Sequence, residues 1–247
     1  MPTKDDLHAQ WDSIAPAWIE KMRGSGDPSR TGLLDDWMLD AVGDVCGLSV
    51  VDLGCGEGRF GRMLAQRGAH VTGVDICAEM IQAASAACVG GERYVVGDME
   101  NLAGIADAQF DLAVSYVTLV DVVNLPAALR EAWRILRPGG RFVVCNLSPM
   151  VTAGNHWVKD EQGRKLHFCL DNYLAEDVRP MRMFGRNVDN FHRTFSTYIN
   201  GFLQAGFVLE GIREPYPLPH QFERCPDNVS DLRVPLFIIY LLRKRNR

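Results

Sequence analysis

The apolar residues of this chain change their spacing along the sequence, and the changes divide it into alternating strands and helices. Short runs of apolar and β-branched residues, bounded by turn signals, predict strands at 49–53, 70–75, 93–96, 110–115 and 141–146. Apolar residues at helical spacing predict intervening helices at 59–66, 78–88 and 125–136. Strands that alternate with helices in this way are typical of an α/β fold built on a parallel sheet.

The N-terminal part predicts helices ahead of the first strand. Apolar residues at helical spacing run through 5–22 and resume in 33–41, so that residues 1–45 form two helical segments. Proline has no amide hydrogen to donate inside a helix, and Pro16 therefore predicts a kink or a division into two short helices.

The C-terminal part predicts a closing helix and two more strands. An amphipathic helix begins near Phe195 and ends before Gly206, because glycine suits the left-handed position after a helix. Strands follow at 207–214 and 234–242. Together with the five earlier strands they make seven, and we expect one doubly wound, mostly parallel α/β domain over 1–247.

Composition and charge narrow the class of protein. The content of 47% hydrophobic and 23% charged residues is ordinary for a soluble domain, and no run approaches the ~20 apolar residues that span a membrane. A net charge of −5 disfavours a nucleic-acid partner, which calls for a basic face. Seven cysteines without a C-x-x-C pair indicate neither a metal site nor a disulfide framework. Because no signal peptide is visible, we expect a cytoplasmic protein, either a monomer or a homodimer.

The most informative stretch is the turn after the first strand, Asp52-Leu-Gly-Cys-Gly-Glu-Gly58. Glycines at 54, 56 and 58 allow positive φ and let a ligand approach without meeting a Cβ, and the helix that starts at Arg59 offers free amides. The spacing G-x-G-x-G differs from the G-x-G-x-x-G of dinucleotide-binding proteins. Asp75 ends the second strand, where an acid can accept both ribose hydroxyls of a nucleoside, a device that NAD enzymes share.

These motifs resemble the class I S-adenosylmethionine (SAM)-dependent methyltransferases, in particular those that act on small molecules. Asp52 to Gly58 is similar to motif I of the family, and Gly73-Val-Asp75-Ile-Cys-Ala-Glu-Met80 to the segment with its ribose-binding acid. Glu131-Ala-Trp-Arg-Ile-Leu-Arg-Pro-Gly-Gly140 is similar to the element E-x-x-R-x-L-x-P-G-G, which dehydrogenases do not carry. The resemblance is strong over about residues 48–146 and weaker beyond them. It implies the Rossmann-like methyltransferase fold.

The resemblance also implies SAM as the cofactor and assigns its contacts. The glycine loop would hold the methionine part, Asp75 the ribose, and Asp98 the adenine amine, unless Asp98 only caps a turn. The N-terminal helices would fold over the cofactor, unless their tryptophans are simply core. The expected cofactor-binding residues are Asp52, Gly54, Cys55, Gly56, Gly58, Asp75, Ile76, Met80, Asp98, Met99, Ser115, Tyr116, Trp11 and Trp18.

Residues 147–193, after the fifth strand, form a longer connection than α/β folds usually have. Long loops at this edge are commonly lids or binding loops. We expect a small cap that binds the methyl acceptor, with one antiparallel strand pair around Trp157 to Phe168. A decorative insert or a dimer contact is the alternative.

Three histidines of the cap region are candidate bases. Phe191-His-Arg-Thr-Phe-Ser-Thr-Tyr198 resembles a segment of small-molecule members of the family, and histidine is suited to remove a proton from a hydroxyl at neutral pH. His192 is the leading candidate catalytic residue, ahead of His156 and His167, although a histidine that packs under the cap would look the same. Arg193 would bind an acceptor carboxylate or pair with an acid such as Glu210 or Glu214.

The predicted function is methyl transfer from SAM to a small organic acceptor, with oxygen preferred as the methylated atom. The Asn/Asp-Pro-Pro-Tyr signature of amino- or base-N methylation is absent, because Ser115-Tyr-Val-Thr118 follows the fourth strand. An RNA or protein methyltransferase is one alternative and would need a basic groove. A catalytically silent SAM-binding partner protein is another, and an NAD enzyme is a distant third.

Overall fold

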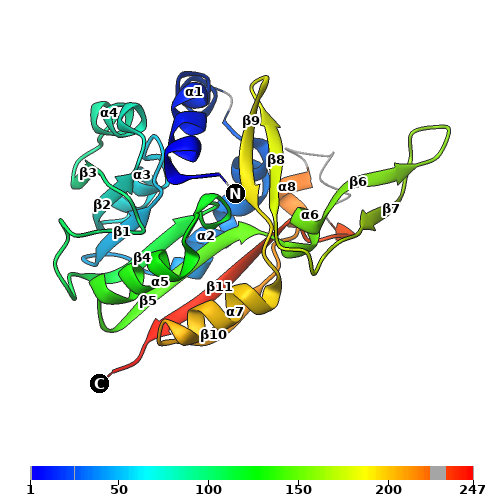
Figure 1. Ribbon diagram of the computed structural model, residues 1–247. Helices are drawn as coiled ribbons and strands as arrows, with labels where there is room; N and C mark the ends of the chain where they lie inside the picture. Colours follow the sequence, from blue (N-terminus) through cyan, green and yellow to red (C-terminus); the bar gives the residue numbers. More distant parts are fainter. Residues whose placement is uncertain (1, 25, 223–231, 247) are drawn as a thin grey trace.

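A seven-stranded sheet runs through the centre of the molecule, with strand order β10-β11-β5-β4-β1-β2-β3 (Figure 1). The computed structural model describes residues 2–24, 26–222 and 232–246. The strands of this sheet are β1 (Ser49–Leu53), β2 (His70–Asp75), β3 (Glu92–Val96), β4 (Phe110–Tyr116), β5 (Leu136–Leu147), β10 (Phe207–Arg213) and β11 (Phe237–Lys244). The first five pair in parallel, and β11 pairs antiparallel with β5 and β10. The predicted doubly wound, mostly parallel sheet is therefore confirmed.

Helices cover both faces of the sheet because successive strand residues alternate between two apolar cores. The helices are α1 (Lys4–Arg23), the π-helix η1 (Arg30–Leu34), α2 (Asp35–Val42), α3 (Arg59–Ala65), α4 (Ala78–Ala86), the 3₁₀ helix η2 (Leu119–Asp121), α5 (Leu125–Ile135), α6 (Pro149–Ala153), α7 (Phe195–Gln204) and α8 (Pro219–Phe222). Val51 and Leu53 pack with residues of α5 and α7, whereas Val50 packs with residues of α2 and α3. None of the described helices is long and apolar enough to cross a membrane.

The N-terminal helix α1 continues as one element through Pro16, so the alternative of two short helices is wrong and that of a kink stays a prediction. Thr3 and Asp6 form a reciprocal capping box at its start, which satisfies amides that the first turn leaves free. Buried Leu7, Ile14 and Met22 hold the helix against the body of the protein. Burial of this face offsets the hydrogen bond that the proline removes.

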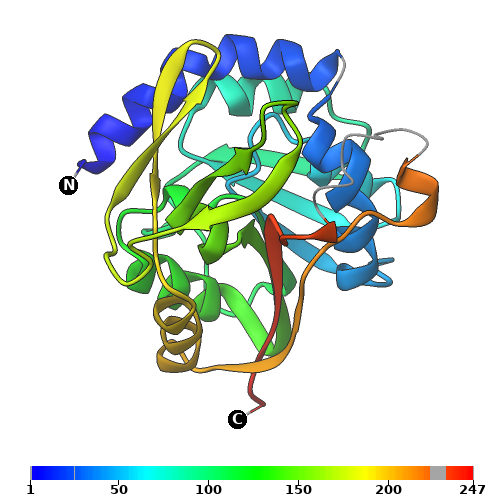
Figure 2. The same ribbon diagram turned by 90° about the vertical axis from the view of Figure 1, so that its right-hand side faces the viewer.

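The insert after β5 contains two antiparallel hairpins where the sequence predicted one strand pair. The first joins β6 (Gly154–Lys159) to β7 (Lys165–Leu170), close to the predicted place. The second joins β8 (Val178–Met183) to β9 (Arg186–Phe191). The β8–β9 hairpin packs along α1 above the sheet, and the β6–β7 hairpin extends away from the body (Figures 1 and 2).

Candidate active site

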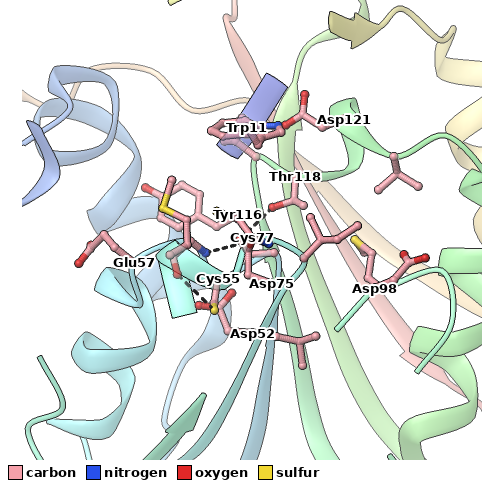
Figure 3. A pocket seen from close by; sticks show the side chains of 18 of the residues that line it. Trp11, Asp52, Cys55, Glu57, Asp75, Cys77, Asp98, Tyr116, Thr118 and Asp121 are labelled. Carbon is pink, nitrogen blue, oxygen red and sulfur yellow. Dashed lines mark hydrogen bonds between the residues drawn. The ribbon is translucent and has the colours of Figure 1, made fainter. Parts of the chain in front are cut away.

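A pocket opens at the C-terminal edge of the sheet, where the chain leaves β1 for one side and β4 for the other (Figure 3). This is the switch point of the doubly wound sheet, where open α/β sheets bind their ligands. All but two of the predicted cofactor-binding residues line the pocket: Trp11, Trp18, Asp52, Gly54, Cys55, Gly56, Asp75, Ile76, Met80, Asp98, Met99 and Tyr116. Gly58 and Ser115 are the exceptions.

The glycines of the loop after β1 are required for two different reasons. Gly54, Gly56 and Gly58 all have positive φ, of 75°, 55° and 79°. A Cβ on Gly54 would lie 2.1 Å from Thr118, and one on Gly58 would lie 2.7 Å from Tyr94, so these two positions allow close packing. A Cβ on Gly56 would instead project into the pocket, with the Trp18 indole nitrogen 3.8 Å away. Gly56 is therefore the glycine that leaves space for a ligand.

Asp75 organises this loop from the end of β2. Its Oδ2 accepts a hydrogen bond from the Gly56 amide at 2.8 Å, and its Oδ1 accepts one from the Cys77 amide at 2.9 Å. Burial raises the pKa of Asp75, while the two amide hydrogen bonds oppose that shift. The carboxylate thus joins the glycine loop to the start of α4 and faces the same pocket as both.

Asp52 is a buried carboxylate that lines the pocket. The side chain is 1% exposed, and among the described residues neither oxygen makes a hydrogen bond. Burial, reinforced by the charge of Asp75 and opposed by Arg30 and by the backbone amide of Gly61, raises the pKa of Asp52 to about 7. Unpaired buried carboxylates are costly, and a cationic ligand group in the pocket would stabilise this one. The carboxylate therefore fits the ammonium group of the methionine part of SAM, which the resemblance places at the glycine loop.

Asp98 caps a turn and also lines the pocket, so its role toward the adenine amine stays a prediction. Its Oδ1 accepts a hydrogen bond from the Glu100 amide at 2.8 Å, as in a turn cap. Its Oδ2 accepts one from Lys4 Nζ at 2.7 Å, and the residue also lines the pocket next to Met99. Lys4 thereby ties the start of α1 to the part of the pocket where adenine is expected.

Trp11 and Trp18 of α1 form an aromatic roof over the pocket. Their rings meet edge to face with centroids 5.7 Å apart, and Trp11 appears at the upper end of the pocket in Figure 3. Trp18 also contacts the ring of Phe184 in the turn of the β8–β9 hairpin, at 6.3 Å, and the Arg30 guanidinium, at 5.0 Å. The roof therefore joins α1 to the inserted hairpin.

Tyr116 forms a rigid wall at the end of β4. Its hydroxyl donates a hydrogen bond to Asp35 at 3.1 Å, and Asp35 is ion-paired with Arg59 at the start of α3. Burial raises the pKa of Tyr116 well above its usual value. The phenol is thus a fixed donor within this network. Ser115 lies inside β4 with 0% exposure, so its side chain does not reach the pocket.

The structure does not place His192 at the pocket. The side chain is 1% exposed, its Nδ1 is 2.7 Å from the Thr152 hydroxyl, and its Nε2 is 2.8 Å from the Tyr173 carbonyl oxygen. Because both ring nitrogens contact protein partners, the imidazole is engaged in holding the insert and is not free to take a proton from an acceptor. His156 and His167 lie on the β6–β7 hairpin and do not line the pocket either.

Of the two alternatives for Arg193, the ion pair with Glu210 or Glu214 does not form among the described residues, and binding of an acceptor carboxylate stays untested. Arg193 is buried and donates hydrogen bonds to backbone carbonyls, among them that of Leu119 at 3.2 Å and that of Val122. Glu210 pairs with Arg243 instead. Arg193 therefore supports η2 and the turn after it, which form one side of the pocket.

Sequence reasoning assigned no role to Asp121, which the structure places in the pocket. It ends η2, five residues after β4, and its Oδ1 accepts a hydrogen bond from Asn190 Nδ2 of β9 at 2.5 Å. The sequence does contain a signal for such a role, since an acid follows β4 at the edge where ligands bind. However, no fixed spacing distinguishes this acid from a solvated loop residue, and Asn190, its hydrogen-bond partner, lies 69 residues away.

The sheet and the pocket together define an α/β protein that binds a nucleoside cofactor. A glycine loop at the switch point, followed by acids at the ends of the next two strands, binds a nucleoside cofactor along one sheet edge. No group of three or more potential metal-ligating side chains occurs within the described residues, and six of the cysteines in that part of the chain are free thiols.

Comparison with known proteins finds relatives both in sequence and in fold. Residues 51–144 match a family model described as a methyltransferase domain. A SAM-dependent methyltransferase from Mesorhizobium loti has a crystal structure that matches with a TM-score of 0.76 and 32% identity, over 84% of this chain and 96% of that one. Malonyl-[acyl-carrier protein] O-methyltransferase of Pectobacterium atrosepticum is 41% identical over 41% of this chain and 40% of that protein. Demethylmenaquinone methyltransferase of Tropheryma whipplei is 35% identical over 48% of this chain and 54% of that protein.

The chain belongs to the class I SAM-dependent methyltransferases, and SAM is the cofactor of this family. It spans about half the length of the two curated relatives named above.

Proposed function

We propose that this protein transfers the methyl group of SAM to an oxygen of a small organic metabolite. The observation that carries the proposal is the covered pocket. Gln10 of α1 donates to Asp189 Oδ2 of β9 at 2.9 Å and accepts from the Asp189 amide at 2.8 Å. These bonds hold the helix and the β8–β9 hairpin together above the sheet edge (Figure 2). A site enclosed in this way suits a small acceptor better than the surface of a folded RNA or protein.

Each side of the pocket has a distinct role in this proposal. Bound SAM would supply an electrophilic methyl group on a sulfonium. Asp75 would accept hydrogen bonds from the ribose hydroxyls, and Asp52 would face the ammonium group. Asp98 would accept a hydrogen bond from the adenine amine, and the adenine ring would lie beside Ile76 and Met99. The aromatic roof would exclude water and orient the acceptor, which is the main way that an enzyme accelerates a displacement of this kind.

The curated relatives support a small acceptor without identifying it. One is named for O-methylation of a malonyl group on a carrier protein, and the other for methylation of demethylmenaquinone. The net charge of −5 is a further argument against an RNA methyltransferase, since RNA binding calls for a basic surface. A catalytically silent SAM-binding protein would present the same cofactor residues and is distinguished only by turnover.

The proposal is tested with radiolabelled SAM and a panel of small acceptors. The panel contains phenols, enols, aliphatic alcohols, carboxylic acids and amines, with total RNA and a protein extract as separate arms. We expect label on at least one hydroxyl compound and none on the two macromolecular arms. SAM binding without transfer to any acceptor would favour the silent protein, and label on RNA or protein would contradict the proposal directly.

A further inference from the structure

Asp121 is an acid of the pocket to which the proposed cofactor contacts assign no role. It lies in the loop after β4 with Thr118, whose hydroxyl contacts the Gly54 carbonyl at 3.2 Å, and therefore at the glycine-loop end of the pocket. Asp98, expected at the adenine, belongs to the loop after β3. Figure 3 shows Asp121 toward the end of the pocket that Trp11 covers, whereas Asp98 lies at another side of it. The carboxylate thus faces the space between the cofactor loop and the roof.

The second feature is how the carboxylate is held. Asn190 Nδ2 donates to Oδ1 at 2.5 Å, and Asn190 is itself 6% exposed in the inserted hairpin. No hydrogen bond to Oδ2 occurs among the described residues, and this oxygen remains available to a ligand. An amide that fixes one carboxylate oxygen and leaves the other in the pocket is the arrangement of an oriented proton acceptor.

The electrostatic surroundings keep this carboxylate ready to exchange a proton near neutral pH. Burial and the charge of Asp75 raise the pKa of Asp121 to about 7, while Asn190, Arg30 and Arg193 oppose the rise. The remaining titratable groups around the cavity are Asp52 of β1, Tyr116 of β4, Asp98 and Glu100 after β3, Glu57, Cys55, Arg59 and Cys77 around the glycine loop and α4, and Lys4 and His8 of α1.

We propose that Asp121, oriented by Asn190, is the general base of the reaction and selects an acceptor that has a hydroxyl proton to lose. This inference rests on the proposed function and names its acceptor chemistry. In the transfer step the acceptor O–H bond breaks and its proton moves to Asp121 Oδ2. The O–CH₃ bond forms while the S–CH₃ bond breaks, and the bonding pair stays on sulfur, which leaves S-adenosylhomocysteine and a methyl ether.

The charge of Asp121 also argues against a free carboxylate as acceptor. A carboxylate acceptor has no proton to give and would bring a second negative charge next to the half-buried carboxylate of Asp121. A phenol or an enol has a proton to lose and is neutral at pH 7. The structure therefore assigns this protein to hydroxyl methylation, in contrast to the relative named for methylation of a malonyl group.

The first test requires no acceptor. Calorimetric titration compares SAM with S-adenosylhomocysteine on the purified chain and on Asp121→Asn at pH 8, where the wild-type carboxylate is ionised. An acid facing the reacting sulfur favours the cationic sulfonium. We expect the variant to bind SAM about tenfold more weakly and S-adenosylhomocysteine within about twofold of wild type. Asp107→Asn, an exposed acid outside the pocket, is the matched control.

The second test uses turnover of the best hydroxyl compound from the panel. For wild type, kcat/KM should rise with pH to a plateau with a midpoint near 7. Asp121→Asn should lower the plateau by about 100-fold or more and remove the pH limb. Asn190→Ala should reduce kcat and move the midpoint while S-adenosylhomocysteine affinity is kept, which a purely structural role would not do.

The outcomes separate the two claims. An unchanged ratio of SAM to S-adenosylhomocysteine affinity in Asp121→Asn overturns the placement of this acid, whether or not an acceptor is found. Full turnover by Asp121→Asn, or a carboxylic acid as the preferred acceptor, overturns the role as base. Absence of turnover by wild type on every compound refutes the proposed function, and the affinity ratio still decides where Asp121 faces.

Discussion

At the scale of single residues, the positive-φ glycines after β1 and the acids at the strand ends shape the pocket. The loop glycines and the strand-end acids were found because backbone conformation and strand ends fix where such residues lie. The prediction of His192 as the catalytic base fails because the sequence does not show which hydrogen bonds a histidine side chain makes. Asp121 was missed for the complementary reason, since the Asn190 amide that orients it comes from a distant hairpin.

Gly56 provides the sharpest test at this scale. Gly56→Ala should abolish measurable binding of S-adenosylhomocysteine, because its Cβ would project into the cofactor space beside Trp18. Gly47→Ala is the matched control, since Gly47 also has positive φ, of 72°, but a Cβ there meets nothing within 4 Å. Both variants should lose about 1–2 kcal/mol of unfolding free energy through backbone strain. Equal cofactor affinity in the two variants would show that Gly56 does not face the ligand.

Asp75 should contribute to the affinity for S-adenosylhomocysteine in two ways. Its carboxylate would bind the ribose, and it holds the Gly56 amide of the glycine loop in place. We expect Asp75→Ala to weaken S-adenosylhomocysteine binding by about 100-fold, which corresponds to the loss of two charge-assisted hydrogen bonds. Asp75→Asn should lie between this variant and wild type. Calorimetry checks both, and unchanged affinity in Asp75→Ala would remove the ribose assignment.

At the scale of elements, the central sheet was predictable and the insert was not. Buried parallel strands are short apolar runs in the sequence, and helices with one apolar stripe follow each of them. The β8 strand contains Pro180 and two arginines, so it lacks the alternation that marks a strand. The two-residue turn Phe184-Gly185, with φ of 48° and 77°, was the available signal for the second hairpin.

The contact between α1 and the β8–β9 hairpin predicts energetic coupling across the roof. In a double-mutant cycle, Gln10→Ala and Asp189→Ala should show a coupling of about 1 kcal/mol in unfolding free energy, as expected for a half-buried side-chain hydrogen bond. Gln10→Ala combined with Asp160→Ala, on the other hairpin, should be additive. A coupling free energy of zero for Gln10→Ala and Asp189→Ala would mean that α1 and the β8–β9 hairpin do not stabilise each other through this contact.

At the scale of the whole molecule, the acids of the pocket make stability depend on pH. Burial raises the pKa of Asp52 and of Asp121 to about 7, from 3.8. The folded chain therefore binds more protons than the unfolded chain between about pH 4 and pH 7, and unfolding free energy falls as pH rises through this window. Asp111 and Glu131 have lowered pKa values, and their contribution is lost only below that window.

Thermal unfolding of the cofactor-free protein tests this pH dependence. We expect Tm to drop by roughly 5–10 °C from pH 5 to pH 8, with a shallower drop for Asp52→Asn, which stays neutral throughout. SAM should reverse most of the loss at pH 8, because its ammonium compensates the ionised Asp52. A Tm that is flat or rises over this range would contradict the buried placement of these acids.

The central claim is that the switch-point pocket binds SAM, and titration calorimetry on the purified chain tests it most directly. The structure predicts one site per chain for SAM and for S-adenosylhomocysteine, with micromolar or tighter affinity, abolished in Gly56→Ala and absent for NAD. No measurable heat or Tm shift with either adenosyl compound, or equal binding of NAD, would contradict the account.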